Sequence, residues 1–346
     1  MKLGMSSEAM TWAVFVSVTV RGFIALTLEA PTGLQNGAWI SPLIGVVPVL
    51  LWLLWLENVA GDDSSHHCLA AKVLSPVLLV VTLLDGGAIL LTLVRSAAYL
   101  ALDRRQSILQ AIPLCLAVFW CTARNGDSVG YAAKLGTRLF PLLLLPVLLL
   151  QARNFRPGWL RPLLGNGMGG IVEGGVRMAG KAIPATSVLL LREKDTKRAP
   201  GTMFHIAFGS TAVLCGLLLA FQMMMPTQQT PMDWMGRLDA LLTNGRGPLY
   251  LQLPMIAMWY FGLLHLISVE CFASAALLQR LTRLRSGLAC CGICVCAIAA
   301  IWLTGLHEAA QSAPVQQLQF AAIGMLAALL ILAIAIGGDK KCGSSK

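Results

Sequence analysis

The stretch Leu163–Leu191, LLGNGMGGIVEGGVRMAGKAIPATSVLLL, decides how the rest of this sequence is interpreted. It is apolar overall but carries residues that oppose a regular helix, namely Gly165, Gly167, Gly169, Gly170, Gly174, Gly175, Gly180 and Pro184. Each glycine inside a helix costs about 1 kcal/mol relative to alanine, and a proline removes an amide donor. In a bilayer, irregular backbone is tolerated only where protein or water covers it. The stretch therefore predicts an interrupted membrane helix with a binding site near the midplane.

Three charged residues interrupt the same stretch. Glu173, Arg177 and Lys181 follow one another at intervals of four, which places them along one stripe of a helix. The stripe either contacts a ligand or lines an aqueous entrance or a partner surface. We expect the break that meets the ligand to involve Gly180, Lys181, Pro184, Ala185 and Thr186.

The composition of the whole chain indicates a polytopic membrane protein. Of 346 residues, 57% are hydrophobic and 12% are charged, and the mean hydropathy is +0.73. A soluble domain carries about 25% charged residues, so an ordinary soluble domain is excluded. The net charge of +10 does not indicate nucleic-acid binding, because the basic residues lie in short loops between apolar runs. The sequence predicts one integral membrane domain over residues 1–346.

Ten apolar segments predict ten transmembrane helices in an all-α fold. They cover about 10–28, 38–56, 73–102, 108–122, 139–150, 163–191, 204–225, 249–278, 287–303 and 318–336. Lysine and arginine are more frequent in the loops on the side of the termini, which predicts that both termini are cytoplasmic. The basic and glycine-rich run 123–138 is expected as a connecting loop before the fifth helix.

The first and sixth segments are both interrupted, and they lie five helices apart. This spacing is typical of two five-helix halves related by an inverted repeat, as in the LeuT-like architecture of amino-acid permeases. We assign the first repeat to about 10–150 and the second to about 163–303, with the C-terminal region, about 287–337, counted as helices nine and ten. Helices one and six are predicted to be broken.

Charged and polar residues inside the apolar segments are the other candidates for a site. A charge in the bilayer interior is costly and either pairs internally or serves a function. Arg21 either pairs with Glu29 or Asp85 or contacts a ligand, and Asp85 either pairs with Arg21 or Arg95 or takes part in function. In the eighth segment, Glu270 is a candidate for ion or proton coupling, as is Asp85. His265 is either a hydrogen-bonded interior histidine or a ligand contact.

No catalytic or metal motif was found. The sequence contains no GxSxG and no HExxH motif, and its ten cysteines form no paired CxxC clusters with metal-ligand spacing. We expect no enzyme activity, no metal site and no cofactor. The cysteines inside apolar segments are expected to pack as small hydrophobic residues.

Several local strings resemble one family in their order and spacing. They are NGAWISPLIG at Asn36–Gly45, ARNGDSVGYAAKLGTRLFPLLLL at Ala123–Leu145, RPLLGNGMGGIVEGG at Arg161–Gly175, and the eighth helix from Trp259 through CFASA. On these strings the chain resembles the spore germination permeases, the B subunits of nutrient germinant receptors in the amino-acid/polyamine/organocation superfamily. The resemblance extends over nearly the whole chain.

This resemblance implies a sensor in the inner membrane of a bacterial spore. The sensor would bind a small nutrient, commonly an amino acid, and act with an A-type membrane subunit and a C-type lipoprotein subunit. The family places its ligand pocket among helices one, three, six and eight. Carried over to this sequence, the pocket includes an unwound part of helix one at Val20, Arg21 and Gly22, and Ser268 and Phe272 in helix eight. In helix three, the charged residue Asp85 and its neighbour Gly86 are our candidates for the site.

Two functions therefore remain open at this stage. The first is a nutrient-sensing, transporter-like subunit with no chemistry of its own, in which helix ends bind the charged groups of an amino acid. The second is a secondary active transporter of amino acids or related metabolites, with Asp85 or Glu270 coupling protons. A purely structural subunit is a weaker third reading, because broken helices cost stability that scaffolding does not need.

Overall fold

The structure is a computed structural model that describes residues 5–27, 37–61, 76–83, 85–89, 93, 116, 126–151, 155–161, 164, 167–191, 201–224 and 252–282. Every secondary-structure element in these ranges is a helix. The long helices are α1 (Ser7–Thr27), α2 (Ser41–Gly61), α5 (Gly126–Gln151), α6 (Met168–Ala185), α7 (Thr202–Met224) and α9 (Gln252–Thr282). Two 3₁₀ helices, η5 (Pro157–Leu160) and η6 (Ser187–Leu191), precede and follow α6, and residues 76–83 and 85–89 are also helical.

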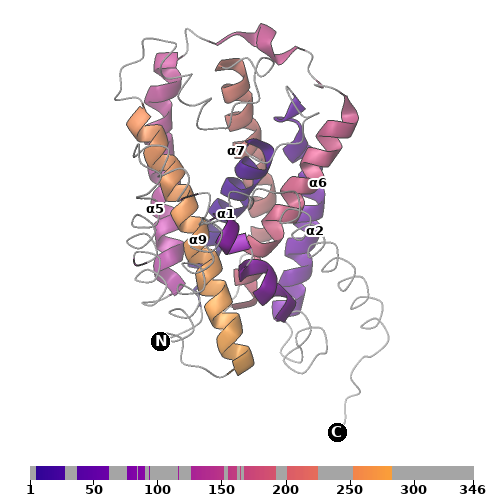
Figure 1. Ribbon diagram of the computed structural model, residues 1–346, viewed down its shortest axis with the longest axis vertical. Helices are drawn as coiled ribbons and strands as arrows, with labels where there is room; N and C mark the ends of the chain where they lie inside the picture. The colour runs from indigo at the N-terminus through magenta and orange to yellow at the C-terminus, as the bar shows by residue number, and fades with distance from the viewer. Residues whose placement is uncertain are drawn as a thin grey trace, which may run out of the picture.

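Helix α1 occupies the centre of the bundle (Figure 1). It packs against α5, α6, α7 and α9, while α2 packs chiefly on α6 and α7. The helix is buried along most of its length, from Ala9 to Leu26. Helix α1 is therefore one wall of any site that lies between it and α5, α6, α7 or α9.

The bundle has the helices of an integral membrane protein. Among the described residues, Ser7–Thr27, Thr202–Ala220 and Ala257–Leu278 are long and apolar enough to cross a bilayer. Ser41–Glu57 and Pro76–Ile89 are shorter apolar helices. The predicted count of ten spans stays a prediction, because the segments 287–303 and 318–336, and all of 108–122 except residue 116, lie outside the described residues.

Glycines allow two pairs of helices to approach closely. A Cβ on Gly130 of α5 would lie 2.2 Å from the carbonyl oxygen of Ala9 in α1, and one on Gly45 of α2 would lie 2.8 Å from the carbonyl oxygen of Gly175 in α6. Small residues at such contacts let helix backbones pack together in a membrane. Gly130 of α5, Gly45 of α2 and Gly175 of α6 thus serve close packing between helices.

The prediction that helix one is broken is wrong. Helix α1 is a continuous α-helix from Ser7 to Thr27, and it passes through Val20, Arg21 and Gly22 without interruption. Gly22 is used for packing instead, since a Cβ there would lie 2.5 Å from Leu214 Cδ1 of α7. Arg21 is compatible with the helix because it is paired, as described below.

The sixth segment is interrupted, but near its end. Gly167, with φ of 117°, precedes the first residue of α6, and the following glycines lie within the helix. The α-helix ends at Ala185, Thr186 forms a turn, and η6 continues the chain. The break therefore lies at Thr186, the last residue of the stretch Gly180–Thr186 in which it was predicted.

The run 123–138 was predicted as a loop, and this is also wrong over the part that the structure describes. Helix α5 begins at Gly126 rather than near Leu139. Gly126, Gly130 and Gly136 lower the intrinsic helix propensity of this run, but each lies against a neighbouring helix, where a side chain would collide. Tertiary packing overrides the local preference.

Candidate functional site

Arg21 of α1 is the largest fully buried side chain of the described core. Its exposure is 1%, and its Nη2 forms an ion pair with Asp85 Oδ1. Asp85 is 4% exposed and belongs to the helical stretch 85–89. Of the alternatives that the sequence left open for Arg21, the structure contains the internal pair with Asp85.

A second acid, contributed by α9, lies near the Arg21 guanidinium group. Glu270 of α9 is 1% exposed, and its Oε1 lies 3.9 Å from Arg21 Nε. Within the described part of the chain, neither oxygen of Glu270 has a hydrogen bond, nor has Asp85 Oδ2. Buried carboxylate oxygens without hydrogen bonds are energetically costly, so these atoms are suited to accept bonds from an incoming group.

Lys181 of α6 adds a second positive charge. Its side chain is 4% exposed, and both Lys181 and Arg21 interact electrostatically with Glu270. Arg21, Asp85, Lys181 and Glu270 thus form what we call the charge cluster, in which four elements of the bundle each contribute one residue. Two cations and two anions give a formal charge of zero, so the group as a whole avoids the cost of a net buried charge.

Gly86 lets the third helical segment approach α9. A Cβ on Gly86 would lie 3.2 Å from Glu270 Oε2, which is closer than most side chains tolerate. A larger residue at this position would displace the Glu270 carboxylate. Gly86 is therefore a wall of the charge cluster.

His265 lies one to two turns from Glu270 on α9 and faces α1. Its Nε2 is 3.3 Å from the carbonyl oxygen of Ala13 and 3.5 Å from Ser17 Oγ, and its ring stacks on Phe261. Because a carbonyl oxygen only accepts, the ring nitrogen Nε2 carries the proton and donates to Ala13. The imidazole is a buried link between α1 and α9, as the interior-histidine interpretation predicted.

Three hydroxyl residues that the sequence reading did not single out line the same interfaces. Ser274 Oγ of α9 donates to Thr82 Oγ1 at 2.8 Å, and Ser17 contacts His265. Each lies one helical turn from a charge of the cluster, as Ser17 and Arg21, Thr82 and Asp85, and Glu270 and Ser274 do. A hydroxyl residue three or four positions from a charge inside an apolar run was the feature of the sequence that could have identified these three residues.

The C-terminal end of α6 is hydrogen-bonded to α2 through Thr186. Trp52 Nε1 donates to Thr186 Oγ1 at 2.7 Å, and Thr186 Oγ1 donates to the carbonyl oxygen of Ile183 at 2.7 Å. Pro184 and Ala185 are buried at this end, and Gly180 is half-buried. Of the predicted stretch Gly180–Thr186, Lys181 is the residue that the structure brings to Glu270.

Four other predicted residues lie apart from the charge cluster. Val20 lines an apolar cavity, Gly22 faces Leu214, Ser268 Oγ donates to the carbonyl oxygen of Leu264 in its own helix, and Phe272 packs against Gly126. The structure thus brings together Arg21, Asp85, Gly86, Lys181 and Glu270, with His265 beside them.

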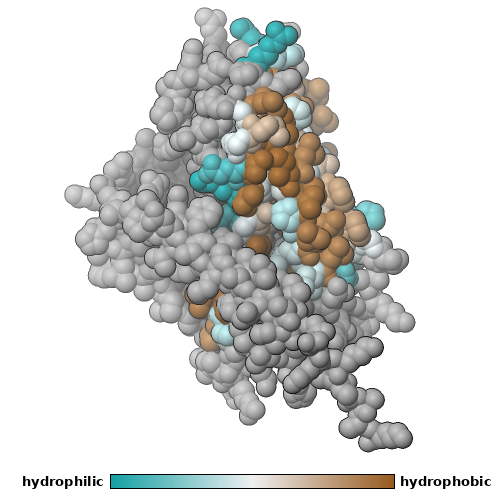
Figure 2. All heavy atoms as spheres, turned by 90° about the vertical axis from the view of Figure 1, so that its right-hand side faces the viewer, coloured by the Kyte–Doolittle hydropathy of each residue, from teal (hydrophilic) through white to brown (hydrophobic). Residues whose placement is uncertain are grey.

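The stripe of Glu173, Arg177 and Lys181 is divided between the surface and the interior. Positions eight residues apart differ by about 80° around a helix. Glu173 and Arg177 form an ion pair at 2.6 Å with side chains 51% and 26% exposed, whereas Lys181 is buried. The surface around them is apolar: Figure 2 shows a hydrophobic ridge on the side formed by α2 and α6, where Val47, Leu51, Val172 and Val176 are exposed.

Metal ligands do not gather in the part of the chain that the structure describes. No group of three or more His, Cys, Asp or Glu residues has a geometry that could hold a metal ion there. The two described cysteines, Cys215 and Cys271, lie within apolar helices and form no disulfide with one another.

Comparisons with known proteins bear on the fold. No family model matches the chain, and no curated protein matches it. Solved structures of the manganese transporter of Eremococcus coleocola do resemble it. A mutant with a histidine replaced by alanine has a TM-score of 0.56 at 15% identity, over 96% of this chain and 77% of that one. Two mutants at a glutamate give TM-scores of 0.56 and 0.54 at 14% identity, with the same coverage.

This chain has a transporter-like membrane fold. The likeness extends over nearly the whole chain, and at 14–15% identity it concerns the fold alone. Together with the apolar helices it identifies an integral membrane protein. The inverted repeat and the spore membrane remain predictions.

Proposed function

We propose that this chain is a transporter-like membrane subunit that senses a small nutrient by binding it at the charge cluster. The nutrient that we propose is an amino acid. The observation that supports the proposal is a buried, formally neutral group of two cations and two anions whose carboxylate oxygens are incompletely bonded. An amino acid is itself a zwitterion. It brings one carboxylate and one ammonium group and leaves the net charge of the site unchanged.

The chemistry of each half of the cluster matches one end of such a ligand. Arg21 and Lys181 are donors that suit a carboxylate, and Arg21 in particular can offer two parallel N–H bonds. Asp85 and Glu270 suit an ammonium group, and three of their four oxygens have no hydrogen bond among the described residues. A bound zwitterion would supply bonds that these atoms lack, which gives the bound state its advantage.

Binding at this place requires movement of helices. All four residues are at most 4% exposed, so the site is closed in this structure. A ligand that enters must separate Arg21 from Asp85 or Lys181 from Glu270, and these residues belong to different elements. Differential affinity for the closed and separated states would shift their populations, and partner subunits would respond to that shift. The resemblance to spore germination permeases assigns that role to an A-type membrane subunit and a C-type lipoprotein.

Secondary active transport of amino acids or related metabolites is the second candidate. It is favoured by the fold shared with the manganese transporter and by Glu270. This buried acid has no hydrogen bond among the described residues, which suits reversible protonation. A divalent metal cargo fits the cluster poorly, because Arg21 and Lys181 lie beside the two acids. In either case we propose that the chain catalyses no covalent chemistry.

The test of binding uses the purified full chain in lipid nanodiscs. A panel of amino acids is screened for thermal stabilisation, and the best is compared with analogues that lack either the amino or the carboxyl group. A ligand at 100 times its dissociation constant stabilises by about 2.7 kcal/mol. We expect at least a tenfold weaker affinity in Lys181→Met and in Glu270→Gln. Glu173→Gln, at an exposed position of α6, is the matched control.

The results separate the proposals. Equal stabilisation of the native chain, Lys181→Met and Glu270→Gln by the same amino acid would remove the charge cluster from the binding site. Liposome uptake then distinguishes sensing from transport: accumulation driven by a proton gradient, in the chain alone, would replace the sensor with a transporter. Nutrient-triggered germination with an unchanged dose response in both variant strains would likewise remove Lys181 and Glu270 from the nutrient site.

A further inference from the structure

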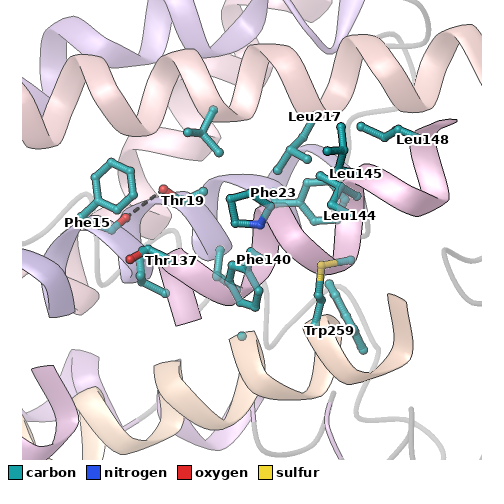
Figure 3. A pocket seen from close by; sticks show the side chains of 16 residues that line it. Phe15, Thr19, Phe23, Thr137, Phe140, Leu144, Leu145, Leu148, Leu217 and Trp259 are labelled. Carbon is teal, nitrogen blue, oxygen red and sulfur yellow. Dashed lines mark hydrogen bonds between the residues drawn. The ribbon is translucent and has the colours of Figure 1, made fainter. Parts of the chain in front are cut away.

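An apolar cavity lies on the other side of α1 from the charge cluster. It has a volume of about 440 Å³ and is enclosed by α1, α5, α7 and α9. Figure 3 shows Phe15, Thr19 and Thr137 toward one end of the cavity and Leu144, Leu145, Leu148 and Leu217 toward the other. A space of this size between membrane helices is large enough for part of a ligand, so its occupant is a question of chemistry.

The lining offers almost no unsatisfied hydrogen-bonding group. Its two hydroxyl groups are already used within their own helices: Thr19 Oγ1 donates to the carbonyl oxygen of Phe15 at 2.8 Å, and Thr137 Oγ1 donates to that of Lys134 at 2.8 Å. Water needs two to four polar partners to be stable in a cavity. The cavity therefore suits an apolar occupant.

The cavity is separate from the charge cluster. Its α1 lining consists of Phe15, Val16, Thr19, Val20 and Phe23, which fall on one side of the helix, whereas Arg21 projects from the opposite side. A ligand in the cavity does not touch the charged groups. The two sites have α1 and α9 in common, and no residue that lines the cavity belongs to the charge cluster.

The cavity continues to the outer surface of the bundle between α5 and α7. Both helices pack on α1 but have no extensive contact with one another. Leu145 of α5 and Val213 of α7 line the cavity and are nevertheless 57% and 41% exposed. Outward from Leu145, Leu142 and Leu149 are 68% and 65% exposed, so the surface around the opening is apolar as well.

We propose that an acyl chain of a bilayer phospholipid occupies this cavity. In a membrane-spanning helix bundle, an opening between two apolar outer faces leads to lipid, where acyl chains are present at high concentration. The lining accepts methylene groups and offers no fixed charge to select a headgroup or a polar solute. An acyl chain inserted there packs on α1 and fills space that the side chains leave empty, which stabilises the packed helices.

The experiment uses a phospholipid that carries a photoreactive diazirine in its acyl chain, reconstituted with the full chain in nanodiscs. After irradiation, labelled peptides are mapped by mass spectrometry. We expect labels on the cavity side of α5, α7 and α9, at Leu144, Leu217 and Met258. Val213→Trp, which fills the opening, should lower this labelling at least fivefold. Leu142→Trp on the exposed face of α5 is the matched control and should retain it.

Two results would overturn the proposal. One is equal labelling of the cavity residues in Val213→Trp and in Leu142→Trp. The other is loss of the label on addition of a water-soluble apolar amino acid such as leucine, which would make the cavity a solute site. If Val213→Trp does not give a monodisperse protein, Leu217→Trp fills the cavity from within and carries the same comparison. Equal labelling in the two variants leaves the proposed function intact, because none of these positions touches the charge cluster, whereas displacement by leucine would place an amino-acid site in the cavity.

Discussion

One side of α1 carries buried charge, and the other side carries a hollow. On the first side, Ser17 and Arg21 meet His265, Asp85 and Glu270. On the second, Phe15, Val20 and Phe23 line an apolar cavity. The comparison shows that a single helix of 21 residues separates a cluster of buried charges from an apolar cavity.

The energetic requirements of the two sides differ accordingly. A charged residue near the bilayer centre costs about 2.5–3.5 kcal/mol or more unless it is paired, and the neighbouring helices supply the partners of Arg21. The cavity side needs no specific partner, because its lining residues carry no charge that must be paired. Substitutions on the charged side should therefore have large and specific effects, and those on the cavity side small ones.

The largest effect is expected for Arg21→Met. The change leaves Asp85 and Glu270 as two buried acids with Lys181 as their remaining cation in the charge cluster. Removing one partner of a buried pair typically costs about 3–5 kcal/mol. We expect a large fall in the thermal stability of the chain in nanodiscs, measured by loss of monodisperse protein on heating.

A double variant tests the reason for this fall. Arg21→Met combined with Asp85→Leu removes both members of the pair and should recover much of the stability, since apolar pairs can replace buried ion pairs. If Arg21→Met alone is as stable as the native chain, the pair contributes nothing. The charged side would then resemble the cavity side in its tolerance.

Close packing gives the second contrast, through Gly22 and Gly262. In Gly22→Ala the new Cβ would lie 2.5 Å from Leu214 Cδ1, whereas in Gly262→Ala it would lie 3.2 Å from the two methyl groups of Val20. Val20 lines the cavity and has room to shift, but Leu214 is fully buried. We expect a loss of about 1–3 kcal/mol for Gly22→Ala and about 0.5 kcal/mol or less for Gly262→Ala.

Thermal unfolding of the two variants in the same lipid measures the difference. Gly216→Ala on α7, where a Cβ would meet nothing within 4 Å, controls for the general gain from replacing a helical glycine. Equal losses at Gly22 and Gly262 would mean that the cavity side is packed as tightly as the other.

The sequence predicted the helical membrane class and the charged positions better than it predicted the backbone. Arg21, Asp85 and Glu270 are conspicuous because a charge in an apolar run must be paired or functional. The sequence alone could not choose between Asp85 and Glu29 as the partner of Arg21, because that choice depends on how distant segments pack. The structure contains the pair with Asp85.

The errors have one physical cause. Arg21–Gly22 and the glycines of α5 lower helix propensity, and the sequence reading therefore expected a break and a loop. In the structure Gly22 and Gly130 are sites of close helix contact, and both helices are continuous. Propensity sums local costs, while a glycine that allows two backbones to touch gains stability from a residue far away in sequence. The cavity was not predictable from the sequence either, because its walls come from helices that lie far apart along the chain.

Hydroxyl groups on the two sides of α1 should differ by a smaller amount. Ser17→Ala removes a polar neighbour of the buried His265, which lies 3.5 Å away, whereas Thr19→Val removes a hydroxyl that bonds only the backbone of its own helix among the described contacts. The net worth of a buried hydrogen bond is about 0.5–1.5 kcal/mol. We expect a loss of about 1 kcal/mol for Ser17→Ala and a change within about 0.5 kcal/mol for Thr19→Val.

The thermal stabilities in nanodiscs again provide the measurement. His265→Leu, which removes the ring nitrogens, is combined with Ser17→Ala in a double-mutant cycle that isolates the contact. A coupling of zero between the two would show that the Ser17 hydroxyl and the imidazole do not interact, and the polar side of α1 would be limited to Arg21.

The smallest effect is expected at Arg177, which lies one turn before Lys181 on α6 but points elsewhere. Its ion pair with Glu173 is partly exposed, and pairs of this kind at i, i+4 contribute about 0.3–0.5 kcal/mol. Lys181 is 4% exposed and acts on Glu270. Arg177→Ala should therefore leave stability within about 0.5 kcal/mol and ligand-induced stabilisation unchanged, whereas Lys181→Met should weaken binding at least tenfold. If instead Arg177→Ala abolishes the ligand response and Lys181→Met preserves it, the site is on the outer face of α6, and the buried charges of α1 serve only to hold the helices together.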